Sequence, residues 1–512
     1  RMKSSSSGVF LHELGHNLGV WHANYWRTTP PSITGPGNNL EYGNIFDVMG
    51  SSGSNGQYTA SFKNTLSWMP PEQFWNVTSS GLYRISQTDN AIADPSLRYA
   101  LRVRRDAERD FWAEFRLRHN TNVGFTNGLM MTFDQWGLGG IGGSGGAPLN
   151  GSNRGAQLLD MTPGSFGNGI TDTRNDSALW VGRTFSDPDF NIHFTPVANN
   201  TTTVPPSMDV QVQIGDVPGN NAPTLSIAAS ATSVGTGVGV TFTATASDPD
   251  GDTLAYAWVF DDGNYSINNS AVQTKSWGTA GHYQVLCTAS DMKGKRTTKS
   301  VLITVGTPTT FTVSGNVTGP DSLPLEGVYV ANYAPSNNTT HGNSGTFRGT
   351  WTDSDGNYTI TRLAAGTYSV RANLYPLVFN NQSATVGPSV TGEDFTSTSL
   401  PAVTISYPDD VAAEGSTANP ATIRLTREGD TTADLSVQFY NVNTGTATRT
   451  TDYTLSPAPT AGTSPDGGNG TSQYIIPAGS ATLDITLTPV NDTAAEGVEV
   501  ASLDFVNTAQ GY

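Results

Sequence analysis

The chain has 512 residues, of which 56 are glycine and 13% are charged, and its formal net charge is −17 at pH 7. Such a length accommodates roughly three to five domains, and the composition is typical of soluble, mainly β extracellular proteins. No apolar run approaches the roughly 18 residues of a membrane span, and no basic cluster offers a surface to nucleic acid, so neither a membrane nor a nucleic acid is an expected partner.

The cysteine content limits how the chain can be stabilised. Cys287 is the single cysteine, which excludes an internal disulfide. Stability must then come from packing and from any bound metal, and this favours a bacterial exoprotein over an animal one. The sequence begins at Arg1 without a methionine. We therefore expect a fragment, for which the lack of a visible signal peptide is uninformative.

The stretch HELGHNLGVWH, residues 12–22, predicts a helix that presents metal ligands. His12 and His16 lie four residues apart, so they project from one face of a helix, one turn apart. The other face should pack on a core, because it carries apolar side chains only. These are Phe10, Leu11, Leu14 and Leu18.

A glycine after this helix explains how a third ligand can reach the same ion. Gly19 allows a positive φ that ends the helix and reverses the chain toward His22. Three neutral imidazoles bind zinc (Zn2+) and leave one position for a water, whose pKa the metal lowers to roughly 7. Glu13 is the expected general base for that water. The alternative is three structural histidines that fall together by chance.

The pattern H-E-x-x-H-x-x-G-x-x-H resembles that of the metzincin metallopeptidases. EYGNIFDVMG, residues 41–50, is similar to the turn that places a methionine, here Met49, beneath the zinc histidines of that clan. Together the two motifs resemble the gametolysin-like branch, which comprises secreted proteases. The resemblance implies that residues 1–74 are the C-terminal part of a metzincin catalytic domain. Its implied zinc ligands are His12, His16 and His22, with Glu13 as the catalytic base.

Strand patterns dominate after residue 74. Runs such as FWAEFRLR and MDVQVQI alternate apolar and polar residues, and they predict a β-sandwich over residues 75–217 that is associated with the protease region. We therefore expect a mainly β multidomain chain, in which a partial α+β protease region precedes a series of β-sandwich modules.

Three further modules follow the linker-like segment DVPGNNAP. Residues 222–306 resemble a PKD domain through SDPDGD and YAWVFDDG. Residues 310–398 resemble a carboxypeptidase regulatory-like sandwich through TDSDGNYTI and LAAGTYSVRA. Residues 401–512 resemble a Calx-β domain, truncated at its end, through VAAEGSTANPATIRLTR and NDTAAEGVE.

The last of these modules is strongly acidic. Residues 400–512 carry three basic and thirteen acidic side chains. This charge is either a solvating surface or a set of calcium ligands. The Calx-β resemblance implies a calcium site at one end of the sandwich. The matching positions are Glu414, Asp452, Asp492 and Glu496.

The sequence thus predicts a secreted or cell-surface zinc endopeptidase that acts on extracellular protein or cell-wall glycoprotein, with β modules that tether it or bind substrate. Two alternatives stay open: a non-catalytic adhesin with a vestigial protease domain, and a zinc hydrolase of a non-peptide substrate. We further expect the chain as given to hydrolyse no peptide. In metzincins the apolar face of the zinc helix packs under a sheet that would precede Arg1, whereas the β modules should fold regardless.

Overall fold

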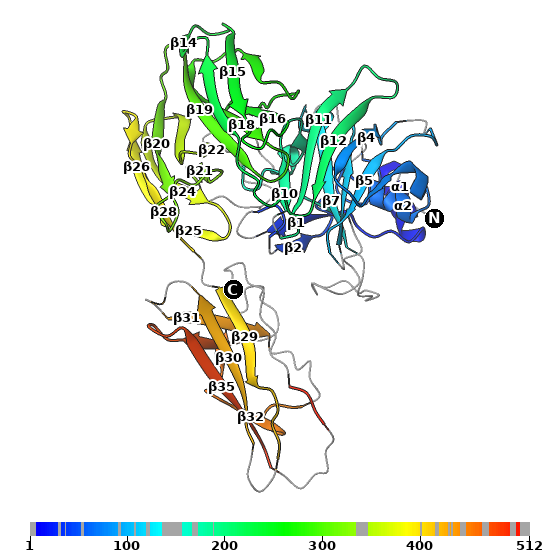
Figure 1. Ribbon diagram of the computed structural model, residues 1–512, viewed down its shortest axis with the longest axis vertical. Coiled ribbons are helices and arrows are strands. Elements are labelled where there is room, and N and C mark those ends of the chain that lie inside the picture. Colours follow the sequence, from blue (N-terminus) through cyan, green and yellow to red (C-terminus); the bar gives the residue numbers. More distant parts are fainter. Residues whose placement is uncertain are drawn as a thin grey trace. The chain divides into compact units, whose positions relative to one another are not determined.

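Nearly all regular structure in the chain is β-sheet, which confirms the predicted mainly β multidomain class (Figure 1). The chain forms two units, the first made of Arg1–Tyr375 and Phe379–Ser397 and the second of Pro376–Val378 and Thr398–Tyr512. The computed structural model describes all residues except 1–6, 29–31, 36, 53–55, 91–93, 107–108, 119–122, 136–155, 166–172, 188, 334–346, 400–401, 415–418, 429–430, 432–433, 441–446, 463–470, 492–497 and 502–512.

The first sheet of unit 1 joins segments from both sides of residue 74. Its strand order is β2-β1-β8-β7-β6-β5-β3, with β9 paired to β7. β1 runs parallel to β8, and Asn24 lies opposite Gln157. The predicted domain boundary after residue 74 therefore falls within one folded body. The strands are β1 (Asn24–Thr28), β2 (Gly37–Leu40), β3 (Trp75–Val77), β5 (Ala100–Arg104), β6 (Arg109–Glu114), β7 (Gly128–Gln135), β8 (Ala156–Leu158) and β9 (Leu179–Trp180).

A second sheet, ordered β10-β11-β12-β4, packs on the first. The alternation in MDVQVQI turns Met208, Val210 and Val212 inward, where they contact a cluster that includes Phe111 and Phe133. Burying each such side chain contributes about 1.5–3 kcal/mol, so this core holds both sheets in place. The strands are β4 (Gly81–Ser86), β10 (Phe185–Asp187), β11 (Ile192–Asn200) and β12 (Ser207–Ile214).

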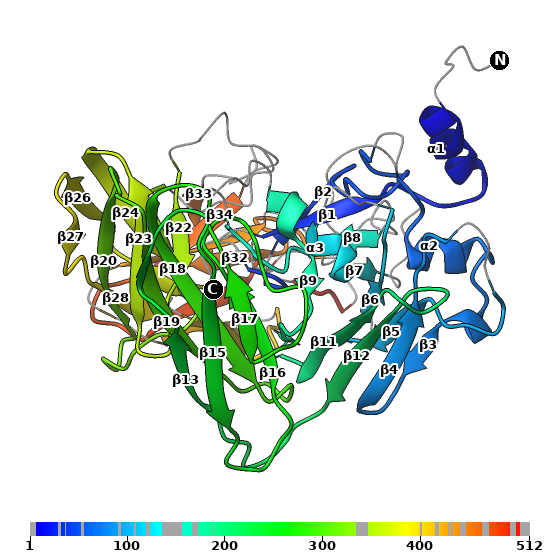
Figure 2. The same cartoon turned by 90° about the horizontal axis from the view of Figure 1, so that it is seen from above.

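Helices are few and short. Helix α1 lies at the outer edge of unit 1 (Figure 2). Among the described residues, none of the helices has the length and apolar character needed to cross a membrane. The helices are α1 (Ser7–Asn17), α2 (Ala60–Thr65) and α3 (Val123–Thr126), with single 3-10 turns at Pro71–Gln73 and Thr173–Asp176.

The next module is a sandwich of two sheets, ordered β13-β15-β17 and β14-β19-β18-β16. Trp258 and Phe260 face its core, as the strand pattern predicts, and Cys287 is buried beside them. The strands are β13 (Thr224–Ala229), β14 (Ser233–Val234), β15 (Val240–Ser247), β16 (Ala255–Val259), β17 (Val272–Lys275), β18 (Gly281–Ser290) and β19 (Arg296–Val305).

A second sandwich follows, with sheets β23-β20-β28-β25 and β22-β21-β24-β26 and with β27 paired to β20. Buried hydrogen bonds join it to the preceding module: Asp261 accepts from the hydroxyl of Thr361 at 2.5 Å, and Gln284 accepts from Thr350 at 2.8 Å. The strands are β20 (Phe311–Thr318), β21 (Tyr329–Ala331), β22 (Gly349–Trp351), β23 (Asn357–Leu363), β24 (Gly366–Asn373), β25 (Leu377–Phe379), β26 (Gln382–Val386), β27 (Val390–Thr391) and β28 (Phe395–Ser399).

Unit 2 is a further two-sheet body with its own core. Its sheets are ordered β29-β30-β35-β32 and β31-β34-β33, and Leu425, Val437 and Ile485 are buried between them. The strands are β29 (Ala402–Asp409), β30 (Ala421–Glu428), β31 (Leu435–Tyr440), β32 (Tyr453–Ser456), β33 (Thr460–Gly462), β34 (Thr471–Ile476) and β35 (Thr482–Pro489).

Candidate metal centre

Helix α1 ends in the way that the glycine predicts. Gly19 has a φ of +94°, and its backbone N–H donates to the carbonyl of His16 at 3.0 Å. Val20 donates back to the carbonyl of Gly15 at 3.1 Å. These bonds satisfy the last carbonyls of the helix and turn the chain sharply, so that His22 returns to the face that carries His12 and His16.

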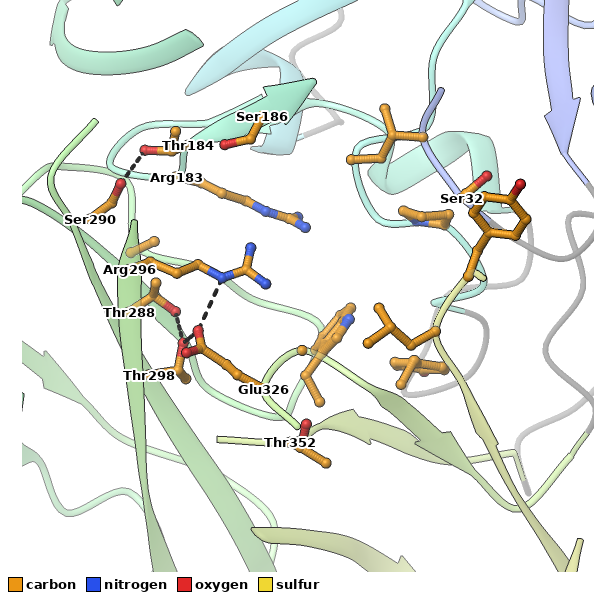
Figure 3. A pocket seen from close by; sticks show the side chains of 18 of the residues that line it. Ser32, Arg183, Thr184, Ser186, Thr288, Ser290, Arg296, Thr298, Glu326 and Thr352 are labelled. Carbon is orange, nitrogen blue, oxygen red and sulfur yellow. Dashed lines mark hydrogen bonds and ion pairs between the residues drawn. The ribbon is translucent and has the colours of Figure 1, made fainter. Parts of the chain in front are cut away.

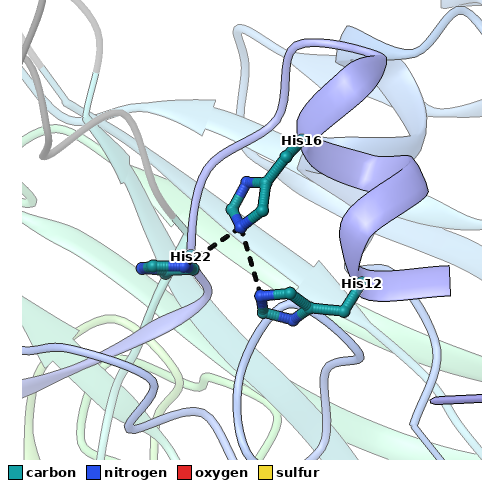
Figure 4. A group of neighbouring side chains, drawn as sticks. All are labelled: His12, His16 and His22. Atoms are coloured by element: carbon teal, nitrogen blue, oxygen red, sulfur yellow. Dashed lines mark hydrogen bonds between the residues drawn. The ribbon is translucent and has the colours of Figure 1, made fainter. Parts of the chain in front are cut away.

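The three imidazoles converge on a common point (Figure 4). Nε2 of His16 lies 3.1 Å from Nε2 of His12 and 3.1 Å from Nε2 of His22. All three side chains are half-buried beside the loop that follows the helix. The structure thus brings together the three ligands that the sequence predicts.

Each of these rings is held through its other nitrogen. Nδ1 of His12 donates to the carbonyl of Val48 at 2.9 Å, and Nδ1 of His16 donates to the carbonyl of Val20 at 3.1 Å. Nδ1 of His22 donates to the carboxylate of Glu41 at 2.7 Å. A ring whose Nδ1 carries the proton has a lone pair on Nε2. All three free lone pairs therefore meet where the rings converge.

This donor set fits a zinc ion. With zinc–nitrogen bonds of about 2.05 Å, a tetrahedral ion holds two ligand nitrogens about 3.3 Å apart, close to the spacing found here. Carbonyls and a carboxylate on the far nitrogens are the partners that orient histidine ligands in metal sites. Burial lowers the pKa of His22, although Glu41 opposes the change, and a neutral ring is the form that binds metal.

Met49 packs directly against helix α1. Its side chain is fully buried, and its sulfur would stand 2.4 Å from a methyl group added at Gly15. The hydroxyl of Tyr58 also reaches the helix and donates to the carbonyl of Leu11 at 2.6 Å. A glycine at this position of the motif is what allows the methionine turn to approach the helix so closely.

A buried carboxylate shapes the methionine turn. Asp47 accepts from the backbone N–H of Met49 at 2.7 Å and of Thr59 at 2.5 Å. Arg116 is buried alongside and donates to the carbonyls of Phe46 and Tyr58. Burial raises the pKa of Asp47 to about 6, against the lowering effect of Arg116 and of the two N–H donors.

Two neighbours of the histidines were missed by the sequence reasoning. Glu41 and Tyr42 belong to EYGNIFDVMG, which was interpreted only as the methionine turn. Glu41 orients His22, and the ring of Tyr42 lies 3.7 Å from the ring of His22. Tyr42 has a φ of +60°, which is unusual for a residue other than glycine, and strain of this kind often marks a functional site. That φ was the detail that the sequence could not reveal.

Glu13, the predicted base, is an exposed side chain of α1. Burial, Glu41 and Glu13, in that order, raise the pKa of Tyr42. The predicted apolar face of the helix is largely open. Phe10, Leu11 and Leu18 are 51%, 40% and 47% exposed, whereas Leu14 is half-buried.

The predicted calcium positions lie in unit 2. Glu414 is exposed and Asp452 half-buried, whereas Asp492 and Glu496 fall outside the described residues. Asp452 accepts from the backbone N–H of Thr448 at 2.5 Å. Among the described residues, Glu414 and Asp452 belong to no group of three carboxylates whose oxygens lie within 4.8 Å of one another, so the calcium site stays a prediction.

A second carboxylate group lies in the module of β13–β19. Ligand atoms of Asp248, Asp252 and Asp291 lie within 4.8 Å of one another. Lys293 donates to Asp252 at 2.5 Å and neutralises part of this charge. The first two residues belong to SDPDGD, which was used only as a family signature. Oxygen ligands of this kind suit calcium rather than zinc.

The fold and these contacts define a chain of β-sandwich modules that follows a three-histidine candidate metal centre. Residues 220–305 match the PKD domain family, so the chain contains a PKD domain there, as predicted for residues 222–306.

Solved structures include similar PKD domains. The PKD1 domain of the Vibrio cholerae metalloprotease PrtV is 33% identical, with 17% of this chain and 100% of that chain covered and a TM-score of 0.15. The PKD1 domain of Vibrio anguillarum Epp is 29% identical, with 17% and 99% covered and a TM-score of 0.15. No curated protein matches the chain. The family match is confined to residues 220–305, and the metzincin resemblance of residues 1–74 rests on the sequence motifs.

Proposed function

We propose that this chain belongs to a secreted zinc-dependent endopeptidase whose substrate is extracellular protein or cell-wall glycoprotein. The observation that carries the proposal is the convergence of the Nε2 atoms of His12, His16 and His22, each on a ring whose Nδ1 proton is already engaged. Histidines that merely fill a core have no reason to point their lone pairs at one another, because that arrangement is repulsive without a cation.

The residues around this point have distinct tasks in peptide hydrolysis. A bound zinc ion supplies a polarised water and stabilises the oxyanion of the substrate. Glu13 accepts the proton of the attacking water and passes it to the leaving amine. Glu41 fixes the orientation of His22, and Tyr42 packs on the His22 ring and limits the access of solvent to it.

The modules support an extracellular setting. The chain contains a PKD domain, and one PKD domain that it resembles at 33% identity belongs to a metalloprotease. The β modules would tether the enzyme to an extracellular polymer or hold it away from a cell surface. The same modules would suit a non-catalytic adhesin. Only the metal site therefore distinguishes an enzyme from an adhesin.

The test combines metal analysis with hydrolysis of denatured casein by the natural full-length protein. We expect one zinc per chain at this site, and casein cleavage that a chelator abolishes. Glu13→Gln should keep the zinc and lose at least about a hundredfold in turnover. Glu72→Gln is the matched control, because Glu72 is an exposed glutamate of a separate 3-10 turn.

Three outcomes would contradict the proposal. A protein without zinc at His12, His16 and His22 would support the adhesin. A zinc protein that leaves casein intact but cleaves an ester or amide of another kind would support the non-peptide hydrolase. Full casein cleavage by Glu13→Gln would remove Glu13 from the mechanism.

A further inference from the structure

A cavity of about 360 Å³ lies inside unit 1, away from the histidines, and this volume is within the range of roughly 300–1,000 Å³ that is usual for ligand pockets. Its wall combines the loop between β1 and β2, the segment from Trp180 to Ser186, strands β18 and β19 of the PKD domain, and parts of the following module. Figure 3 shows Arg183 and Arg296 pointing into this space from one wall, with Ser32 across from them.

The guanidinium of Arg183 has no acceptor among the described residues. It forms neither a hydrogen bond nor an ion pair with them, and its Nη1 is buried without a partner. The group is held over the ring of Trp180, with the guanidinium carbon 4.4 Å from the ring centroid. Arginine only donates hydrogen bonds, and a buried unpaired cation is costly. Such a group is therefore open to an acceptor beyond the described residues, such as a bound ligand.

A second donor of the same wall is also unsatisfied. Nε1 of Trp180 is buried and reaches no acceptor among the described residues. Trp180 itself is fixed, because its ring stacks on Tyr265 with centroids 3.9 Å apart. An acceptor-rich ligand would satisfy both donors without any rearrangement of the wall.

The two carboxylates that line the cavity each form an ion pair with another arginine, and neither forms an ion pair with Arg183. Glu326 accepts from Nε of Arg296 at 3.0 Å and from the hydroxyl of Thr298 at 2.7 Å. Asp189 accepts from Arg105 at 3.2 Å. Burial lowers the pKa of Arg183 to about 10. Tyr265, Asp160 and Asp176 act to raise this pKa and Arg296 acts to lower it, so the guanidinium stays charged at neutral pH.

The remaining lining combines hydroxyl groups with aromatic faces. Ser186 and Ser32 contribute hydroxyls, of which that of Ser32 is buried without a partner among the described residues, and Trp351 and Tyr375 contribute rings. A sugar ring offers hydroxyls around its edge and C–H groups on its faces, so it matches both kinds of surface. A carboxylate on that ring would supply the planar, two-oxygen acceptor that suits a guanidinium.

We propose that this cavity binds a uronic acid, either free or as a residue of an acidic polysaccharide, with its carboxylate on Arg183 and its ring against the hydroxyl and aromatic wall. The site is separate from the proposed zinc centre and does not depend on it. It would give the protein a means of retention on acidic extracellular polysaccharide, whatever reaction the histidines support.

The experiment is calorimetric titration of the purified chain with glucuronate, galacturonate, glucose and sulfate. A chelator is present throughout, so that no carboxylate can bind through a metal at the histidines. We expect saturable binding of at least one uronate, with glucose and sulfate at least about tenfold weaker. Uronate oligosaccharides form a further arm: tighter binding than the monosaccharide indicates a polymer residue as the natural ligand, and equal binding indicates the free acid.

Variants identify the residue responsible. Arg183→Gln should weaken uronate binding at least about tenfold, and Arg183→Lys, which keeps the charge but loses the two-pronged donor, should weaken it several-fold. Arg98→Gln is the matched control, because Arg98 also lies over an indole ring, 5.2 Å from the centroid of Trp75, but does not line the cavity. If Arg183→Gln fails to fold, Arg183→Lys still provides the measurement.

Several results would overturn the proposal. These are the absence of saturable uronate binding up to about 10 mM, glucose or sulfate binding as tightly as uronate, unchanged affinity in both Arg183 variants, or an equal loss of affinity in Arg98→Gln.

Discussion

The Cα of Gly15 faces the sulfur of Met49 so closely that a methyl group at Gly15 would stand 2.4 Å from it. This contact brings helix α1 close to the turn that carries Met49. The two residues are 34 positions apart in sequence, and neither is a metal ligand. Their packing nevertheless decides whether His12 and His16 reach the point that His22 approaches from the following loop.

We expect Gly15→Ala to weaken zinc binding at least about tenfold, because the added methyl must push the helix away from Met49. Competition with a chelator of known affinity measures the effect. Gly278→Ala is the control, because a Cβ there meets nothing within 4 Å. Equal zinc affinity in Gly15→Ala and the unaltered chain would show that the helix position is not set by this contact.

Glu41 should matter for the metal although it does not touch it. Removing its carboxylate in Glu41→Ala frees the ring of His22 to rotate, and we expect a loss of about 10- to 100-fold in zinc affinity. Glu41→Gln keeps an acceptor for Nδ1 and should lose less. If alanine and glutamine variants lose zinc equally, the charge of Glu41 and not its hydrogen bond is responsible.

Asp134 predicts a dependence of stability on pH. It lies opposite Asp110 in the pairing of β6 with β7, and burial and Asp110, in that order, raise its pKa to about 7. A carboxyl whose pKa is higher in the folded than in the unfolded state loses stability as pH rises from about 4 to about 7. Asp134→Asn should therefore match the unaltered chain at pH 4 and be more stable at pH 8, by on the order of 1–3 kcal/mol.

Thermal unfolding across this pH range measures the difference. Asp110→Asn is the contrasting variant, because Asp110 forms an ion pair with Arg102 at 2.6 Å and its loss should destabilise the protein. A stability difference between Asp134→Asn and the unaltered chain that is constant with pH would show that folding does not shift the pKa of Asp134.

The acidic end of unit 2 gives a calcium prediction. If the predicted residues Glu414, Asp452, Asp492 and Glu496 bind calcium, millimolar calcium should raise the Tm of unit 2 relative to EDTA. The stabilisation is about 2.7 kcal/mol at a calcium concentration of a hundred times Kd. Asp452→Asn should remove the shift, whereas Glu428→Gln, an exposed acid on β30, should keep it. A Tm that does not respond to calcium would show that these acidic side chains are solvated surface groups that bind no calcium.

The sequence by itself determined the local features of this protein. Alternation of apolar and polar residues predicted the strands, and the spacing of His12, His16, Gly19 and His22 predicted two imidazoles on one helix and a third in the loop after it, because these patterns depend on residues close together in the chain. The PKD domain was likewise evident from short motifs such as SDPDGD.

Only the tertiary structure decided which distant residues meet. β1 pairs with β8, so the segments before and after residue 74 share one sheet. The sequence could not reveal this pairing, because strand partners depend on tertiary packing and not on proximity in the chain. The positive φ of Tyr42, the approach of Glu41 to His22 and the isolation of Arg183 have no local signature. Arginine side chains are mostly exposed to solvent, and the lack of an acceptor for Arg183 among the described residues becomes visible only once several distant segments of the chain surround it.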